Sequence, residues 1–193
     1  MPHKLSDANK QSRMIIGQTL LATLHGNVVV TDEKWLYASC GNNQQNCRAW
    51  VSPGGDRPHL QSPTISEKKF HIAVAMDFRG QNHFKVFERN ETINSTAYVG
   101  FLAELKQKFR SISGISIMHD NARPHVSAAV QNFFQEHNIT WIRQPSYSPD
   151  MNLLDRFVFR NMEQARNGTC FQNIDDVNQF LATYLNGIRR GVH

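Results

Sequence analysis

Three aspartates of this chain stand beside apolar runs. Asp32 follows "VVV" in "VVVTDEKW", Asp120 ends "ISIMHD", and Asp155 lies in "NLLDRFVF". Burying a carboxylate is costly unless it is paired or bound to a metal ion. Magnesium prefers such hard oxygen ligands, and two divalent ions about 3.5–4 Å apart can activate an attacking oxygen and stabilise a leaving oxygen in phosphoryl transfer. The three residues are therefore candidate ligands of a catalytic metal site.

Each aspartate also has a purely structural explanation. Asp120 can cap a helix that begins near Pro124. The other two can pair with basic neighbours in the sequence, Asp32 with Lys34, and Asp155 with Arg156 or Arg160. The apolar neighbours of Asp155 nevertheless predict that its face of the helix packs inward, which favours a metal ligand there.

Other acids near these positions have weaker claims. Glu33 is a rival ligand, but successive side chains of a strand point to opposite faces, so it should lie on the other side from Asp32. Asp77 in "VAMDFRG" and Asp150 in "YSPDM" are explained by turn chemistry.

The surrounding sequence predicts alternating helices and strands. Apolar periodicity, β-branched runs and turn residues indicate these elements: a helix over 6–24 capped by Ser6, strands over 27–38, 68–78 and 83–89 with a tight turn at 79–82, a helix within 94–110 capped by Ser95 or Thr96, a strand over 115–120, a helix from Pro124, a strand over 139–144, and helices over 152–166 and 173–190. Residues 39–68, rich in Gly, Pro, Asn and Ser, predict a long irregular loop. This order indicates an α/β fold with a mixed β-sheet flanked by helices. An RNase H-like domain has this order, and so do other α/β folds.

Composition sets broad limits. The chain has 193 residues, enough for one domain, and a net charge of +5 with an isoelectric point near 9.3, which is compatible with a nucleic-acid partner without requiring one. The sequence holds no apolar run long enough for a membrane span, and its start lacks a signal peptide, so we expect an intracellular protein without a membrane partner. The three cysteines, Cys40, Cys47 and Cys170, are then expected to be free thiols.

The acidic segments resemble three motifs of a known family. "VTDEKW", "HDNARPH" and "PSYSPDMNLLD" are similar, in this order, to the acidic motifs of the catalytic domain of mariner-family DNA transposases. That family has 34 residues between its second and third aspartates, and residues 121–154 give the same 34 here. "PHKL", "WVSPGG" and "ETINSTAY" add to the resemblance, which covers nearly the whole chain.

The resemblance implies a fold, a reaction and partners. It implies an RNase H-like domain in which Asp32, Asp120 and Asp155 are the catalytic, metal-binding triad, with Mg²⁺ or Mn²⁺ as cofactor and two ions expected. The family cleaves transposon ends by hydrolysis and joins the freed 3′-hydroxyl to a TA target, so DNA, a homodimer in the DNA complex and a nuclear location are implied. Its loop between the first two core strands clamps the partner subunit, which matches residues 39–68.

The resemblance also implies a domain layout. Residues 1–26 correspond to a linker and an N-terminal helix, and residues 27–193 to the catalytic domain. The helix-turn-helix units that bind terminal repeats in the family have no counterpart in these residues. We therefore expect an isolated catalytic domain without sequence-specific recognition of transposon ends.

Four residues beside the acids are candidate DNA contacts. Lys34 and Trp35 follow the first aspartate and can meet a phosphate and an unstacked base; the alternative places Trp35 in the core and Lys34 in solvent. Arg123 and His125 can touch phosphate, or can simply be solvated at a helix start. His119 is expected to support the site without binding metal directly.

Two other functions compete with a transposase. A decayed or domesticated domain would bind DNA or a partner without catalysis. A nuclease of the RNase H type would act on RNA–DNA hybrids, which the fold permits. Metal-dependent nicking of DNA would exclude the domain without catalysis. Preference for an RNA–DNA hybrid over duplex DNA would favour the nuclease of the RNase H type.

Overall fold

The structure is a computed structural model that describes residues 5–23, 27–38, 54–55, 68–88, 91–109, 114–166 and 169–191, with residues 189–191 described as backbone only. Its helices and strands are α1 (Asp7–Thr23), β1 (Val28–Tyr37), β2 (Lys69–Asp77), β3 (Asn82–Phe87), α2 (Ser95–Lys108), β4 (Ser116–His119), α3 (Ala128–Glu136), β5 (Thr140–Arg143), the short 3₁₀-helix η1 (Pro149–Met151), the π-helix η2 (Leu154–Phe159), α4 (Arg160–Ala165) and α5 (Ile174–Gly191). Most of the predicted loop 39–68 lies outside the described residues.

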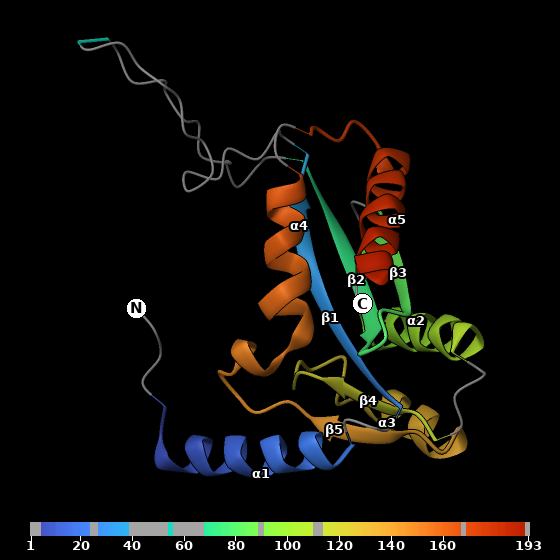
Figure 1. Cartoon of the computed structure of the whole chain (residues 1–193). Helices are drawn as coiled ribbons and strands as arrows, with labels where there is room; N and C mark the ends of the chain where they lie inside the picture. Colours follow the sequence, from blue (N-terminus) through green and yellow to red (C-terminus); the bar gives the residue numbers. More distant parts are fainter. Residues whose placement is uncertain are drawn as a thin grey trace.

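The strands form one mixed sheet. Its order is β3-β2-β1-β4-β5, with β2 antiparallel to both β3 and β1, and β4 parallel to both β1 and β5 (Figure 1). The turn between β2 and β3 contains Gly80, whose positive φ of 78° suits a glycine. The mixed sheet flanked by helices confirms the predicted fold class.

Alternation along β1 divides the protein into two layers. Val28 and Val30 belong to a core shared with η2, α4 and α5, whereas Val29 belongs to a second core shared with α2 and α3. In Figure 1, α4 runs beside β1, and α5 contacts β3. Because side chains alternate, Asp32 continues the face of Val30, and Glu33 continues the face of Val29.

Helix α1 pairs with the 3₁₀-helix η1, which precedes the third aspartate. Both guanidinium nitrogens of Arg13 donate to the carboxylate of Asp150, at 2.8 and 2.6 Å. This pair differs from the prediction, which explained Asp150 by turn chemistry alone. For Asp77 the turn prediction is confirmed, since its carboxylate accepts the backbone N–H groups of Arg79 and Gln81. Ser6 caps α1 as predicted, because its hydroxyl accepts the N–H of Asn9.

Two helix starts differ from the prediction. Helix α3 begins at Ala128, capped by Ser127, instead of at Pro124, because residues 123–126 form a turn first. Asp120 therefore does not cap this helix. Helix α2 is capped by Asn94, whose side chain accepts the N–H of Ala97, and not by the serine or threonine that follow.

The cysteine prediction is also wrong in part. Cys170 is disulfide-bonded, whereas a free thiol was expected. Cys40 and Cys47 lie outside the described residues.

No helix in the part of the chain that the structure describes is long and apolar enough to span a membrane.

Candidate active site

Sheet register brings Asp32 and Asp120 to the same level. The parallel ladder pairs Val30 of β1 with Met118 of β4, and each aspartate follows its partnered residue by two positions. Both therefore lie just past the end of this ladder, on the face that Val30 and Met118 share with the core beneath η2. Residues 88 positions apart in the sequence thus meet at one edge of the sheet because two parallel strands end there.

Asp155 reaches this edge from the π-helix η2. Leu154, Val158 and Phe159 of that helix are buried, which fixes it against β1, whereas Asp155 is exposed on its surface. The prediction of an inward-packed face for Asp155 is therefore wrong, because the wider π-helical turn separates the buried positions differently from an α-helix. Short π-helical segments occur frequently at functional sites.

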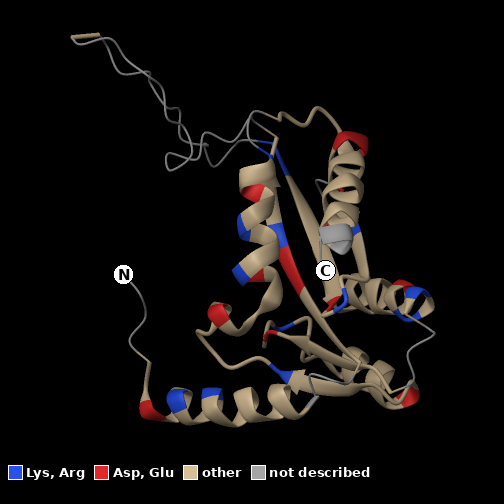
Figure 2. Cartoon of the chain, viewed as in Figure 1, with Lys and Arg blue, Asp and Glu red and all other residues tan. Residues whose placement is uncertain are grey.

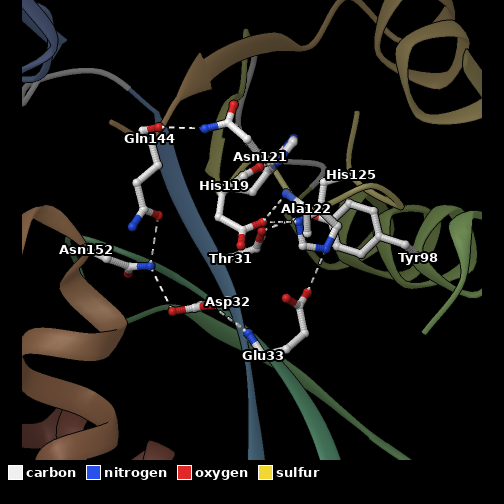
Figure 3. Close-up of polar contacts among 11 residues, drawn as sticks. Thr31, Asp32, Glu33, Tyr98, His119, Asn121, Ala122, His125, Gln144 and Asn152 are labelled. Carbon is white, nitrogen blue, oxygen red and sulfur yellow. Dashed lines mark hydrogen bonds and ion pairs between the residues drawn. The ribbon is translucent and has the colours of Figure 1, made fainter. Parts of the chain in front are cut away.

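Asp32 is held by hydrogen bonds, and within the described residues no Lys, Arg or His side chain pairs with it. Its Oδ2 accepts the side-chain amide of Asn152 at 2.9 Å, and its Oδ1 accepts the backbone N–H of Glu33 at 2.9 Å (Figure 3). Burial, together with the negative charges of Asp155, Glu33 and Asp120, raises the pKa of Asp32 to about 8. The carboxyl group thus sits where negative charge is unfavourable and a cation would be stabilised.

Asp155 shares this condition. Although the residue is exposed, partial burial of its carboxyl group and the charge of Asp120 raise its pKa, against the opposing effects of a hydrogen bond with Asp32 and the nearby ammonium of Lys34. Two carboxyl groups in contact cannot both ionise without cost. A divalent cation between Asp32 and Asp155 would remove that cost.

Asp120 has the opposite electrostatic environment. Its Oδ1 accepts the N–H of Ala122 at 2.9 Å and lies 2.6 Å from Nδ1 of His125. The hydrogen bond with His125 holds the pKa of Asp120 below its usual value, so the group is ionised. Since both contacts fall on Oδ1, the second oxygen has no recorded hydrogen bond.

His125 links Asp120 to the far face of the sheet. Its Nε2 lies 3.2 Å from Oε1 of Glu33, and its ring packs on Tyr98 with centroids 4.1 Å apart. Burial alone would lower the pKa of His125, but the two carboxylates raise it to about 9. Tyr98, fully buried, shares a hydrogen bond of 2.9 Å with Thr31 and so closes the network below (Figure 3).

The predicted place of Glu33 is confirmed. It leaves β1 on the side opposite Asp32, toward His125 instead of Asn152 (Figure 3). Glu33 is therefore no rival for the ligand position of Asp32. It serves the far side of the same site.

The donor set suits a hard divalent cation, although the ligands are not fully assembled. Within the described residues, no three His, Cys, Asp or Glu side chains close on one point as a preformed metal group. Asp32 and Asp155 nevertheless form a pair with uncompensated charge, and Asp120 keeps one oxygen without a recorded hydrogen bond beside them. Carboxylate oxygens with few protein ligands match the needs of Mg²⁺.

The candidate DNA contacts differ in accessibility. Trp35 is 41% exposed and stacks on His71 with centroids 4.1 Å apart, so it is not a core residue. Arg123 is exposed, and Lys34 lies 3.4 Å from Glu163 and so is not simply in solvent. His125 differs from the prediction, because its side chain is only 3% exposed and both nitrogens face carboxylates, which leaves none for a phosphate.

Three polar residues at the site, of which Asn152 and Gln144 are buried, were not singled out by sequence reasoning. Asn152 bridges Asp32 and the side chain of Gln144, 2.9 and 3.2 Å away. Asn121 donates to the backbone of Gln144 and so ties the second motif to the third. Asn152 precedes Asp155 by three residues in "MNLLD", so its closeness in sequence to a candidate ligand was a signal that could have identified it.

His119 supports the site as predicted. It is fully buried, its Nδ1 contacts the carbonyl of Asp120 at 2.8 Å, and its ring stacks on Trp141 with centroids 5.2 Å apart. Burial lowers the pKa of His119 to about 4, which keeps the ring neutral. It therefore anchors the backbone of Asp120 from below.

Comparison with known proteins agrees with this geometry. Residues 29–178, which include all three aspartates, match the DDE superfamily endonuclease family. The chain belongs to the DDE superfamily endonucleases. It is homologous to the human histone-lysine N-methyltransferase SETMAR, with 26% identity over 96% of this chain and 28% of SETMAR.

The resemblance to mariner transposases is confirmed as homology. The Mariner Mos1 transposase of Drosophila mauritiana is 25% identical over 94% of this chain and 55% of its own length. The chain therefore spans about half or less of these two relatives. A Mos1 transposase paired-end complex with the left transposon end superposes with a TM-score of 0.84 at 23% identity, covering 96% of this chain and 57% of that one.

The isolated catalytic domain of Mos1 shares the fold as well. Its crystal structure superposes with a TM-score of 0.69 at 19% identity and covers 98% of this chain and 91% of that one. The RNase H-like fold is thereby established for this DDE endonuclease domain. Paired-end complexes of Mos1 are known with Mn and with Mg.

Proposed function

We propose that this chain is the catalytic domain of a cut-and-paste DNA transposase. It would cleave transposon ends by hydrolysis and join the freed 3′-hydroxyl to a TA target. The observation that carries the proposal is that the carboxyl groups of Asp32 and Asp155 adjoin each other, and burial and neighbouring carboxylates raise the pKa of each. This pair occurs within a DDE endonuclease domain and beside a third, ionised aspartate.

Asp32, Asp120 and Asp155 would hold Mg²⁺ or Mn²⁺, and two ions are expected. When bound, such ions polarise the phosphate and lower the pKa of an attacking water or hydroxyl. The protein supplies the positions: Asn152 orients Asp32, His125 orients Asp120, and the buried side of η2 fixes Asp155. Hydrolysis and strand joining are both in-line displacements at phosphorus, so one such site serves both steps.

DNA is the proposed partner, bound mainly through its phosphates. The net charge is +5, and Figure 2 shows basic positions on β1 and α4 beside the acidic stretch of β1. Lys34 and Arg123 are proposed phosphate contacts, and Trp35 offers a face for an unpaired base. A homodimer in the DNA complex and a nuclear location belong to the same proposal. Its supports are homology to eukaryotic proteins that act on DNA, and a Mos1 complex with transposon ends.

A nicking assay tests the proposal. Supercoiled plasmid is incubated with the protein and Mg²⁺, Mn²⁺ or EDTA, beside the variants Asp120→Asn and Asp175→Asn. Asp175 is an exposed carboxylate at the start of α5, so its variant removes the same charge away from the site. We expect metal-dependent nicking by the wild-type protein and by Asp175→Asn, and none by Asp120→Asn.

Other outcomes would contradict specific parts. Full activity of Asp120→Asn would overturn the site assignment. Faster cleavage of an RNA–DNA hybrid than of duplex DNA would favour a ribonuclease. Absence of nicking with every metal, on DNA that carries cleavable transposon ends as well as on plasmid, would leave only a binding domain.

A further inference from the structure

We propose that Glu33 is a positioning residue that acts through His125 to fix the carboxylate of Asp120. The inference rests on the proposed function, because it concerns the same site. It assigns a role to a glutamate that cannot reach the other aspartates, since it leaves the opposite face of β1 from Asp32. The resulting chain runs from Glu33 to His125 to Asp120.

The chain consists of a hydrogen bond between His125 and Asp120 and an ion pair between His125 and Glu33. His125 Nδ1 lies 2.6 Å from Asp120 Oδ1, and His125 Nε2 lies 3.2 Å from Glu33 Oε1. Each ring nitrogen therefore faces a different carboxylate. Because both nitrogens of His125 face a carboxylate, rotation of the imidazole ring would break one of the two contacts. The position of Glu33 therefore fixes the orientation in which Nδ1 of His125 contacts Asp120.

Burial makes the link more than a surface ion pair. The side chains of His125 and Glu33 are 3% and 14% exposed, whereas that of Asp120 is 50% exposed. Exposed pairs contribute little because water competes for both partners, and water has little access to the lower part of this chain. The ring of Tyr98 packs against the ring of His125, with centroids 4.1 Å apart.

The link has a consequence for the open oxygen of Asp120. Its Oδ1 accepts the N–H of Ala122 and contacts His125, so two contacts hold one oxygen of the carboxylate, and within the described residues Oδ2 accepts no hydrogen bond. Without Glu33 the imidazole can rotate, and Asp120 can adopt other orientations. Loss of such an outer partner typically costs about 10–100-fold in metal affinity.

Mn²⁺ binding to the whole chain, measured by isothermal titration calorimetry, tests this role without requiring DNA cleavage. The variants are Glu33→Gln, Glu33→Ala, His125→Asn and the double variant Glu33→Ala/His125→Asn. Glu104→Ala is the matched control, because Glu104 also pairs with a histidine, His83 at 3.2 Å, but on the surface of α2. Thermal melting of the metal-free proteins shows that each variant is folded.

The expected pattern is specific to an indirect role. Glu33→Ala should weaken Mn²⁺ binding by about 10–100-fold, Glu33→Gln should recover part of that loss because it keeps an acceptor oxygen, and Glu104→Ala should bind as the wild type does. In the His125→Asn background, removal of Glu33 should cause no further loss, since the link is already broken.

Three results would overturn the inference. The first is unchanged affinity in Glu33→Ala. The second is additivity: a loss of Mn²⁺-binding free energy in the double variant equal to the sum of the losses in the two single variants. It would show that Glu33 acts independently of His125. The third is a wild-type protein that binds no Mn²⁺, which would overturn the metal site as well. Mn²⁺ binding without plasmid nicking would count against the proposed function alone, and the variants would still decide the role of Glu33.

Discussion

The two sides of β1 treat their carboxylates differently. On the side of η2, Asp32 and Asp155 adjoin each other, and their pKa values are raised. On the side of α2, Glu33 faces the buried ring of His125, whose other nitrogen reaches Asp120 beside the site and lowers the pKa of Asp120. His125 contacts both Glu33 and Asp120, whereas Asp32 and Asp155 adjoin each other with their pKa values raised. This difference indicates where a cation is expected.

The largest effect should come from removing an uncompensated acid. Asp155→Asn should reduce metal-dependent nicking by more than about 100-fold, beyond the range for outer partners, because it removes a direct ligand. Plasmid nicking with Mn²⁺ measures this, and Asp175→Asn serves as the charge-matched control. If Asp155→Asn nicked as fast as the control, the two faces of β1 would not differ in function.

Metal binding should also stabilise the protein. At a concentration 100 times its dissociation constant, Mn²⁺ should contribute about 2.7 kcal/mol, which for a domain of this size corresponds to a rise of about 5–10 °C in Tm. Thermal melting with and without Mn²⁺ tests this in the wild type and in Asp32→Asn. An equal rise in both proteins would place the binding site elsewhere.

The pH dependence of stability should show the same asymmetry. Asp32 has a pKa of about 8 in the folded protein against 3.8 ordinarily, so folding binds a proton across this range and stability falls as the pH rises through it. His125, at about 9 against 6.5, acts in the same direction between those values, whereas His119, at about 4, acts oppositely below 6.5. The free energy of unfolding should therefore decrease from pH 6.5 to 9.

Asp32→Asn isolates the contribution of one face. This variant should remove about 1–2 kcal/mol of the decrease between pH 6.5 and 8 and leave the remainder, due to His125, in place. Guanidinium chloride unfolding in EDTA at several pH values measures it. An identical pH profile in the variant would show that Asp32 is ionised in the folded protein at neutral pH.

The smallest effect concerns the support of the third motif. Arg13→Ala removes the two hydrogen bonds to Asp150, in an exposed pair that water screens, and should lower the free energy of unfolding by no more than about 1 kcal/mol. Lys10→Ala, which removes an exposed pair with Asp7 on the same helix, is the control. A large loss of nicking in Arg13→Ala, with unchanged stability, would show that α1 also positions the metal-binding face.

Much of this arrangement could be predicted because it depends on local patterns. Buried strands have apolar runs, so Asp32 and Asp120 could be placed at strand ends, and alternation put Glu33 on the far side of β1. The motif spacing placed Asp155 with them. Each of these inferences needs only neighbours in sequence or a known family pattern.

The rest depends on contacts that local patterns do not contain. Asn152 binds Asp32 across 120 positions, and the burial of His125 depends on how β1 lies against the turn after β4. The start of α3 was misplaced because Pro124 suits a first helical turn, whereas Asp120 and His125 close a separate turn before Ser127. The apolar spacing around Asp155 does not distinguish a π-helical turn from an α-helical one.

Anomalous diffraction from crystals containing Mn²⁺ tests the central claim most directly. The account predicts a manganese peak between the carboxylates of Asp32 and Asp155, with an oxygen of Asp120 completing the protein ligands. It also predicts that this peak is lost in Asp155→Asn. A peak elsewhere, or none at saturating Mn²⁺, would contradict the claim that the uncompensated face of β1 is the catalytic metal site.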